Sequence, residues 1–136
     1  MPEPIIYVDR SDVQEGKLVE LKAAIEELAA FVEANEPRAI TYRIYLGDEG
    51  RKMTVFQVHP DSASLEFHLA AAGPIFLKFK ELVQLSSIDV YGTPSDSLRK
   101  LLLAKTGMLG SGTLSVHTPQ AGFDRFGTDV SSTGIH

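Results

Sequence analysis

The sequence predicts an α+β fold in which helices cover one face of an antiparallel sheet. Apolar residues alternate in short segments, they recur at helical spacing in the longer segments between them, and Gly47-Asp48-Glu49-Gly50 joins the middle two strands. The resulting βαββαβ order, from Ile5 to Gly92, is that of the ferredoxin-like arrangement. A chain of 136 residues can bury about 68% of its unfolded surface, which suffices for one domain and an extension.

The first strand and the first helix follow from the residues that open the chain. Ile5-Ile6-Tyr7-Val8 is a short β-branched run, which predicts a strand buried on both faces near the middle of the sheet. Ser11 and Gln14 have the spacing of a capping box, so a helix is expected to begin there. Asn35 and Pro37 should end it. Its core-facing stripe comprises Leu18, Leu21, Ile25, Leu28 and Val32.

The second and third strands are predicted over residues 40–46 and 53–59. Both segments carry large apolar groups at alternate positions and again between them, as Ile44 and Tyr45 illustrate. Helices cover only one face of such a sheet, so the other face needs a partner. The simplest partner is a second copy related by a two-fold axis, which predicts a homodimer through the open sheet face.

A broken helix and a closing strand complete the predicted unit. Asp61 or Ser62 should cap the helix, and Gly73-Pro74 should interrupt it. The last strand is predicted over Ser86–Gly92, where Ile88 and Val90 alternate with polar residues. The domain is therefore placed at residues 1–92.

Residues 93–136 form a predicted C-terminal extension. Thr93-Pro94-Ser95-Asp96 favours a helix start with proline at the first helical position. The extension is expected to contain a helix over 95–106, a flexible linker at Gly110-Ser111-Gly112, a short strand over 113–118 and a polar tail from Gly127.

Composition excludes several classes of function. The net charge of −5 comes without a Lys/Arg cluster, so no nucleic-acid partner is expected. No apolar stretch approaches the ~20 residues that a membrane-spanning helix needs, and no signal-peptide pattern opens the chain. The sequence has no cysteine, which rules out disulfides, thiolate nucleophiles and iron–sulfur clusters. A soluble cytoplasmic protein is expected.

Two segments resemble the antibiotic biosynthesis monooxygenase family. They are Gln57-Val58-His59-Pro60-Asp61 through Ala63-Ser64-Leu65 to His68-Leu69, and Ile40-Thr41-Tyr42-Arg43-Ile44-Tyr45 before it. The similarity covers roughly Ile5 to Gly92. It implies a dimeric α+β barrel with a pocket between sheet and helices. It also implies a substrate class, because several members oxidise phenols or quinols with molecular oxygen and use no metal or flavin.

The resemblance implies the candidate site residues. The family histidine maps onto His68, whereas His59 stands where a tryptophan is usual and Gln57 where a glutamate is usual. A phenol must lose a proton before it passes an electron to oxygen, and a histidine that titrates near neutrality suits that step. The candidate catalytic residues are His68 and His59, and the candidate substrate-binding residues are Tyr42, Arg43, Phe56, Phe67, Phe76 and Phe79.

The sequence leaves a second reading open for each of these residues. A histidine on an apolar helix face is often a hydrogen-bonded core residue, and a strand tyrosine is often a packing residue. The protein would then be a non-enzymatic module of the same fold that binds a small ligand or dimerises. No cofactor or metal is expected in either case, because His59, His68, His117 and His136 show no paired ligand spacing.

Overall fold

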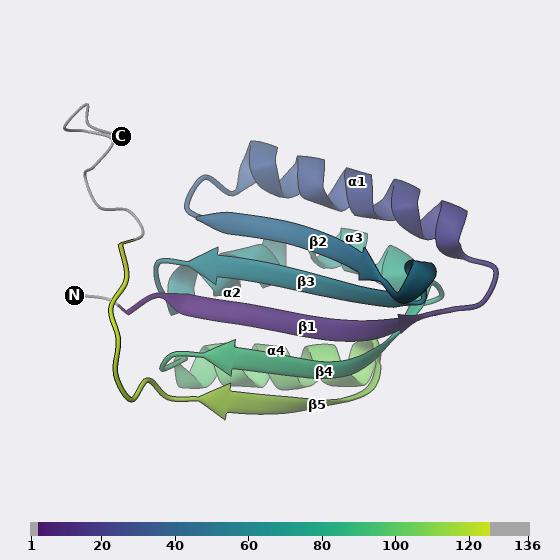
Figure 1. Ribbon diagram of the computed structural model, residues 1–136. Coiled ribbons are helices and arrows are strands. Elements are labelled where there is room, and N and C mark those ends of the chain that lie inside the picture. The colour runs from purple at the N-terminus through teal and green to yellow at the C-terminus, as the bar shows by residue number, and fades with distance from the viewer. Residues whose placement is uncertain (1–2, 126–136) are drawn as a thin grey trace.

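The computed structural model describes residues 3–125, which fold around a five-stranded sheet (Figure 1). The strands are β1 (Ile5–Val13), β2 (Thr41–Gly47), β3 (Lys52–His59), β4 (Val83–Tyr91) and β5 (Gly110–His117). The helices are α1 (Leu18–Asn35), α2 (Ser62–Ala71), α3 (Gly73–Phe76) and α4 (Asp96–Met108), with 3-10 turns η1 (Asp48–Gly50) and η2 (Leu77–Phe79). None of these helices is long and apolar enough to cross a membrane.

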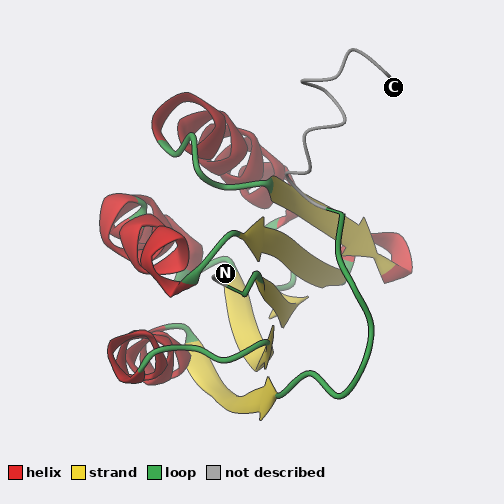
Figure 2. Ribbon diagram, turned by 90° about the vertical axis from the view of Figure 1, so that its left-hand side faces the viewer, coloured by secondary structure: helices red, strands yellow, loops and turns green. Residues whose placement is uncertain are grey.

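The sheet has the order β2-β3-β1-β4-β5, and helices α1 to α4 gather on one side of it (Figure 2). Strand β1 lies in the middle and pairs antiparallel with both β3 and β4. The first four strands and their helices thus confirm the βαββαβ unit and its ferredoxin-like arrangement. The apolar core lies between the sheet and the helices, with Leu21, Leu65, Ile88 and Leu98 wholly buried.

The predicted helix start at Ser11 is wrong, because β1 continues to Val13. Ser11 is buried and pairs with Met53 on β3 and Leu85 on β4. The alternation that points Ile5 and Tyr7 into the core continues to Ser11. Because β3 and β4 also supply hydrogen-bond partners for its backbone, the strand is favoured over the capping pattern. The helix begins instead at Leu18, after a turn, and its N-cap makes no side-chain hydrogen bond.

The extension adds a fifth strand, so the whole sheet is mixed, whereas the four strands of the predicted unit are antiparallel. Strand β5 pairs parallel to β4, and α4 is the crossover between them. The predicted linker at 110–112 is the start of β5. Gly110 has φ of 138°, which favours glycine, and a Cβ there would lie 3.1 Å from the backbone nitrogen of Leu85. The polar tail predicted from Gly127 lies outside the described residues.

Helix α4 begins one residue later than predicted and uses a different cap. Ser95 is the N-cap, and its hydroxyl accepts a hydrogen bond from the Leu98 amide at 3.1 Å. Pro94 therefore lies before the helix and not at its first position. The helix runs to Met108, two residues beyond the expected end.

The sheet face without helices is only partly apolar. Val8 and Val58 lie on it by strand alternation and are already buried in the single chain. Directly opposite Val8 on the same face, Asp89 accepts hydrogen bonds from Arg10 at 3.1 Å and from His117 at 2.9 Å. Apolar and charged groups are thus interspersed on this face, and the prediction of large apolar groups describes only part of it.

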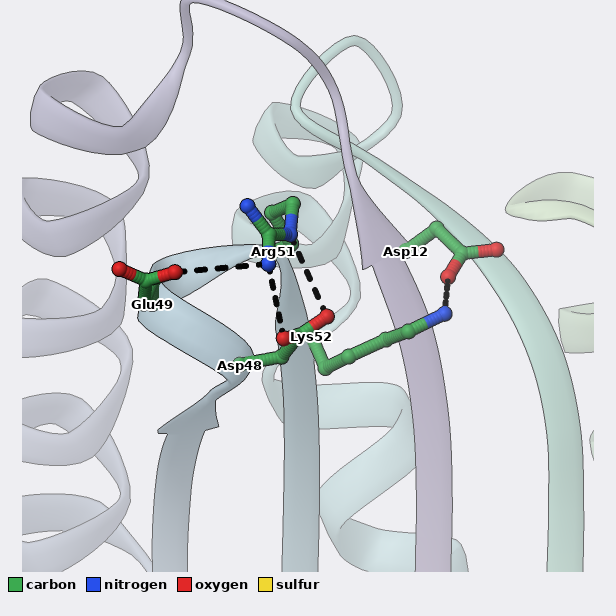
Figure 3. A network of polar contacts seen from close by, with 5 residues as sticks. All are labelled: Asp12, Asp48, Glu49, Arg51 and Lys52. Atoms are coloured by element: carbon green, nitrogen blue, oxygen red, sulfur yellow. Dashed lines mark hydrogen bonds and ion pairs between the residues drawn. The ribbon is translucent and has the colours of Figure 1, made fainter.

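The β2–β3 connection carries an exposed group of ion pairs, drawn in Figure 3 and called the surface network below. Arg51 pairs with Asp48 at 2.9 Å and with Glu49 at 3.6 Å, and Lys52 pairs with Asp12 of β1. Asp48 and Glu49 have φ of 53° and 56°, so left-handed backbone closes this turn.

Candidate functional site

Polar side chains gather in the core, where a sheet under helices would normally carry apolar groups. Tyr42, Gln57 and Tyr7 are neighbours in register across β2, β3 and β1, and they face the helices. Charged and imidazole groups from α2, α4 and the end of α1 lie over them. We call this set the buried polar cluster; it comprises Tyr7, Asp9, Glu36, Tyr42, Gln57, His59, Ser64, His68 and Lys105.

His68 and Glu36 form a buried carboxylate–imidazole pair. The His68 side chain is 0% exposed, and its Nδ1 lies 2.8 Å and 2.9 Å from the two Glu36 oxygens. Burial lowers the pKa of His68, and the Glu36 carboxylate partly opposes that shift. A carboxylate accepts the Nδ1 hydrogen, so the lone pair of a neutral imidazole lies on Nε2. Nε2 has no partner among the described residues.

His59, in contrast, has both ring nitrogens occupied. Its Nε2 lies 2.7 Å from Gln57 Oε1, and its Nδ1 lies 2.7 Å from Ser64 Oγ. An amide oxygen only accepts, so Nε2 carries the hydrogen and the Ser64 hydroxyl donates to Nδ1. Burial, followed by the nearby His68, lowers the pKa of His59 to about 3. His59 therefore stays neutral and orients the Gln57 amide.

Lys105 forms the second ionic part of the cluster with Tyr7 and Asp9. Its Nζ donates to Tyr7 Oη at 2.7 Å and approaches Asp9 Oδ2 at 3.5 Å, while the Tyr7 hydroxyl donates to the same oxygen at 2.5 Å. Burial lowers the pKa of Lys105, and Asp9 opposes this. Burial and the Asp9 charge also raise the pKa of Tyr7 well above its usual value, so the phenol stays protonated.

Aromatic rings close the space between these groups. The Phe76 ring lies 5.2 Å from the His68 ring, centroid to centroid, and Lys105 Nζ lies 4.3 Å from the Phe76 centroid. The remaining cavity is about 20 Å³ and is lined by residues that include Asp9, Tyr42, Phe76 and Lys105. A space of this size holds about one water molecule.

Four buried side-chain polar atoms in the described residues lack a hydrogen-bond partner, and all belong to the cluster. They are Asp9 Oδ1, Tyr42 Oη, Gln57 Nε2 and His68 Nε2. Most buried polar atoms in proteins are paired, because an unpaired one costs about 1–3 kcal/mol. The set offers two acceptors, one donor and one hydroxyl, so it complements a molecule that carries hydroxyl groups or water.

The structure brings together only some of the sequence-predicted site residues. His59, His68, Tyr42 and Phe76 meet in the cluster, and Phe79 lines the cavity. Arg43 and Phe56 do not join them, because alternation along their strands directs both side chains to the other sheet face. Phe67 lies outside as well: it precedes His68 on α2 and is 54% exposed.

Three charged residues of the cluster were not predicted as site residues, although the spacing of each one from a buried residue indicates that it faces the core. Asp9 follows Tyr7 by two residues in a strand, Glu36 follows the buried Val32 by four, and Lys105 follows the buried Leu102 by three. Each charged residue thus occupies the next position, at strand or helix spacing, on the side of its element that faces the core. No group of three His, Asp or Glu side chains within residues 3–125 is arranged to hold a metal ion.

No protein-family model and no curated protein sequence matches the chain. Several solved structures do match. MupZ from Pseudomonas fluorescens superposes with a TM-score of 0.72 at 19% identity, over 92% of this chain and 91% of MupZ. SnoaB, a cofactor-independent oxygenase from Streptomyces nogalater, gives 0.57 at 19% identity over 68% and 95%. An antibiotic biosynthesis monooxygenase-like protein from Bacteroides thetaiotaomicron gives 0.53 at 23% identity over 62% and 84%.

These matches establish the class of fold. The chain has the ferredoxin-like α+β fold of antibiotic biosynthesis monooxygenase-like proteins, as the resemblance at Ile40–Leu69 implied. The matches to SnoaB and the Bacteroides protein cover a share of this chain close to that of residues 1–92. The match to MupZ is long enough to reach well into the extension that contains α4 and β5. At these identities the likeness concerns the fold alone.

Proposed function

We propose that the protein is a cofactor-independent monooxygenase-like enzyme that oxidises a small quinol-type aromatic within the buried polar cluster, with His68 as the general base. One observation carries the proposal: the lone pair of His68 Nε2 has no partner in the core formed by residues 3–125, while Glu36 holds Nδ1. A base oriented by a carboxylate and shielded from water is what deprotonation of a phenol requires.

The reaction uses the quinol as its own reductant. A ring hydroxyl gives its proton to His68 Nε2, and Glu36 stabilises the imidazolium that forms. The electron-rich phenolate passes one electron to O₂, and the radical pair combines into a carbon–oxygen bond. The proton held by His68 goes to the peroxide; the C–H bond at the oxygenated carbon then loses its proton as the O–O bond breaks, so that one oxygen stays on the ring and the other leaves as water. Quinol and O₂ thus give a hydroxyquinone and water, and the atoms and electrons balance.

Oxygen uptake with a panel of quinols tests this proposal. His68→Ala should lower turnover by about 10²–10⁴-fold, the usual contribution of a general base. His117→Ala is the matched control, because that histidine is exposed on β5. Glu36→Gln should lower turnover less than His68→Ala and shift its pH profile. Turnover unchanged in His68→Ala removes the assigned base.

A non-enzymatic module of the same fold is the second candidate, and the size of the cavity favours it. A space of about 20 Å³ between Phe76 and Phe79 admits no aromatic ring unless a side chain moves. A module that only packs or dimerises would consume no oxygen with any quinol. It would also bind no phenol, and a calorimetric titration measures that.

The homodimer stays part of the proposal. Support comes from the open sheet face, where Phe56 is half-buried and Tyr45 is 53% exposed in the single chain. Covering such groups favours association. Sedimentation equilibrium should show a dimer that Phe56→Lys weakens, and a wild-type monomer at micromolar concentration would contradict it.

A further inference from the structure

The Phe76 ring touches both ionic parts of the buried polar cluster. Its centroid lies 5.2 Å from the His68 centroid, in an edge-on arrangement, and 4.3 Å from Lys105 Nζ. A single six-membered ring is therefore large enough to contact the imidazole and the ammonium together. The place of Phe76 marks where an aromatic ligand would reach both groups.

Lys105 has no part in the proton abstraction assigned to His68, yet it is one of the most deeply placed charges in the chain. It is 6% exposed, and an ammonium has three N–H donors. One donates to Tyr7, and a second makes only a long contact of 3.5 Å with Asp9. Donor capacity therefore remains for a ligand oxygen beside the Phe76 ring.

We propose that Lys105, carried into the cluster by α4, is a second catalytic residue that binds an oxygen substituent of the substrate ring while His68 deprotonates a hydroxyl elsewhere on that ring. This inference rests on the proposed function and narrows its substrate class. The substrate is a quinol whose second ring oxygen is conjugated with the hydroxyl that His68 deprotonates.

Charge delocalisation explains why two such groups would act together. When a phenol loses its proton, negative charge spreads through the ring to an oxygen conjugated with it. An ammonium fixed beside that oxygen in a water-poor site stabilises the charge far more than it would in water. The titratable groups near Lys105 are Tyr7 and Asp9 of β1, which contact its ammonium, Tyr42 of β2, which lines the same cavity, and His68 of α2. Asp9 is the neighbour that favours the protonated amine.

The ring must enter by displacing Phe76, and the chain there can yield. Phe76 ends α3, a four-residue helix that begins at Gly73-Pro74 and runs directly into the 3-10 turn η2. So short a helix is held by packing and not by its own hydrogen bonds. Phe76→Ala should therefore open the ring site that the wild-type side chain fills.

Binding of 4-nitrophenol tests the proposal without turnover, because its phenolate has a visible absorption band and its nitro group offers the second oxygen. Phe76→Ala should bind the probe at least about tenfold tighter than the wild type. In that background Lys105→Met should weaken binding about tenfold and raise the pKa of the bound probe by about one unit. Lys100→Met is the matched control, because Lys100 is exposed on the same helix.

Two outcomes overturn the inference. The first is binding of the probe phenolate that is equal in the Lys105→Met and Lys100→Met variants. The second is 4-ethylphenol, which lacks the second oxygen, binding as tightly as the nitrophenol. If Lys105→Met fails to fold, Asp9→Asn/Lys105→Met removes the uncompensated carboxylate and serves in its place. Oxygen uptake is scored separately, so loss of the monooxygenase proposal and loss of the lysine role give different results.

Discussion

Strand β1 carries two aspartates that each meet a lysine, and the two pairs lie on opposite faces of the sheet. Asp12 meets Lys52 in the surface network, with side chains 54% and 59% exposed, whereas Asp9 meets Lys105 with side chains 4% and 6% exposed. Hydrogen bonding to Asp12 raises the pKa of Lys52, but burial lowers the pKa of Lys105. The pKa of the lysine thus shifts in opposite directions in the two pairs, because the cost of desolvating its charge dominates only inside the core.

The largest effect should come from breaking the inner pair. Lys105→Ala should lower the free energy of unfolding by about 3–5 kcal/mol, because Asp9 keeps a buried charge without its counter-ion. Urea unfolding measures the change. Asp9→Asn/Lys105→Met should recover most of the loss, since it buries no charge. A loss below about 1 kcal/mol in Lys105→Ala would contradict this prediction, because it would show that the buried pair contributes no more to stability than an exposed pair does.

The pH dependence of stability should follow the buried imidazoles. The folded-state pKa of His59 is about 3, below its usual 6.5, so the unfolded chain binds a proton that the folded chain refuses. This stability is complete above pH 6.5 and falls as pH falls toward 3. His59 alone should remove about 2 kcal/mol between about pH 7 and about pH 5.

The lowered pKa of His68 adds to this slope in the same direction. Unfolding in urea at several pH values measures it. His59→Asn should flatten the slope, because it removes the buried imidazole. A profile that is flat over this window in the wild type would contradict the neutral, buried state of His59.

A smaller effect is expected where burial is partial, at the cap that starts α4. Ser95→Ala removes the acceptor of the Leu98 amide and should cost about 1 kcal/mol in urea unfolding. Ser97→Ala is the control, because its hydroxyl also contacts Glu66 but caps nothing. Equal losses in the two variants would show that the contact with Glu66, and not the cap, matters.

The smallest effect should come from the surface network. Lys52→Ala should leave the midpoint of thermal unfolding unchanged within error, because water and salt screen exposed ion pairs. Calorimetry at low and high salt measures it. A clear loss that persists in high salt would mean that the two faces of β1 differ less than their exposure indicates.

Much of the fold could be predicted because alternation and helical spacing dominate it. Both limits of β2 and β3, and the C-terminal end of α1, lie within one residue of the sequence-based limits. The wrong predictions share one cause, because in each of them a tertiary contact outweighs a local sequence pattern. Ser11 resembles a helix cap, but it lies in β1 and pairs with a strand on each side. Gly110 resembles a linker residue, but it allows β5 to approach Leu85.

The candidate site was harder to predict, because spacing cannot show which face of an element is covered. His68 lies among its expected aromatic neighbours, yet Glu36 reaches it from another helix, 32 residues away. Lys105 is 96 residues from Asp9. Their meeting depends on how α1 and α4 pack on the sheet, and a charge that continues an apolar stripe is the only local sign of it.

The origin of Lys105 bears on any attempt to shorten this protein. By topology, a chain cut after Gly92 keeps every strand and helix of the ferredoxin-like unit. The shortened chain would nevertheless lack Lys105, the partner of Asp9, and it would expose the apolar residues of β4 that α4 and β5 cover. For protein engineering, the smallest piece worth expressing reaches at least to the end of β5, and a trimmed version needs a neutral residue at position 9.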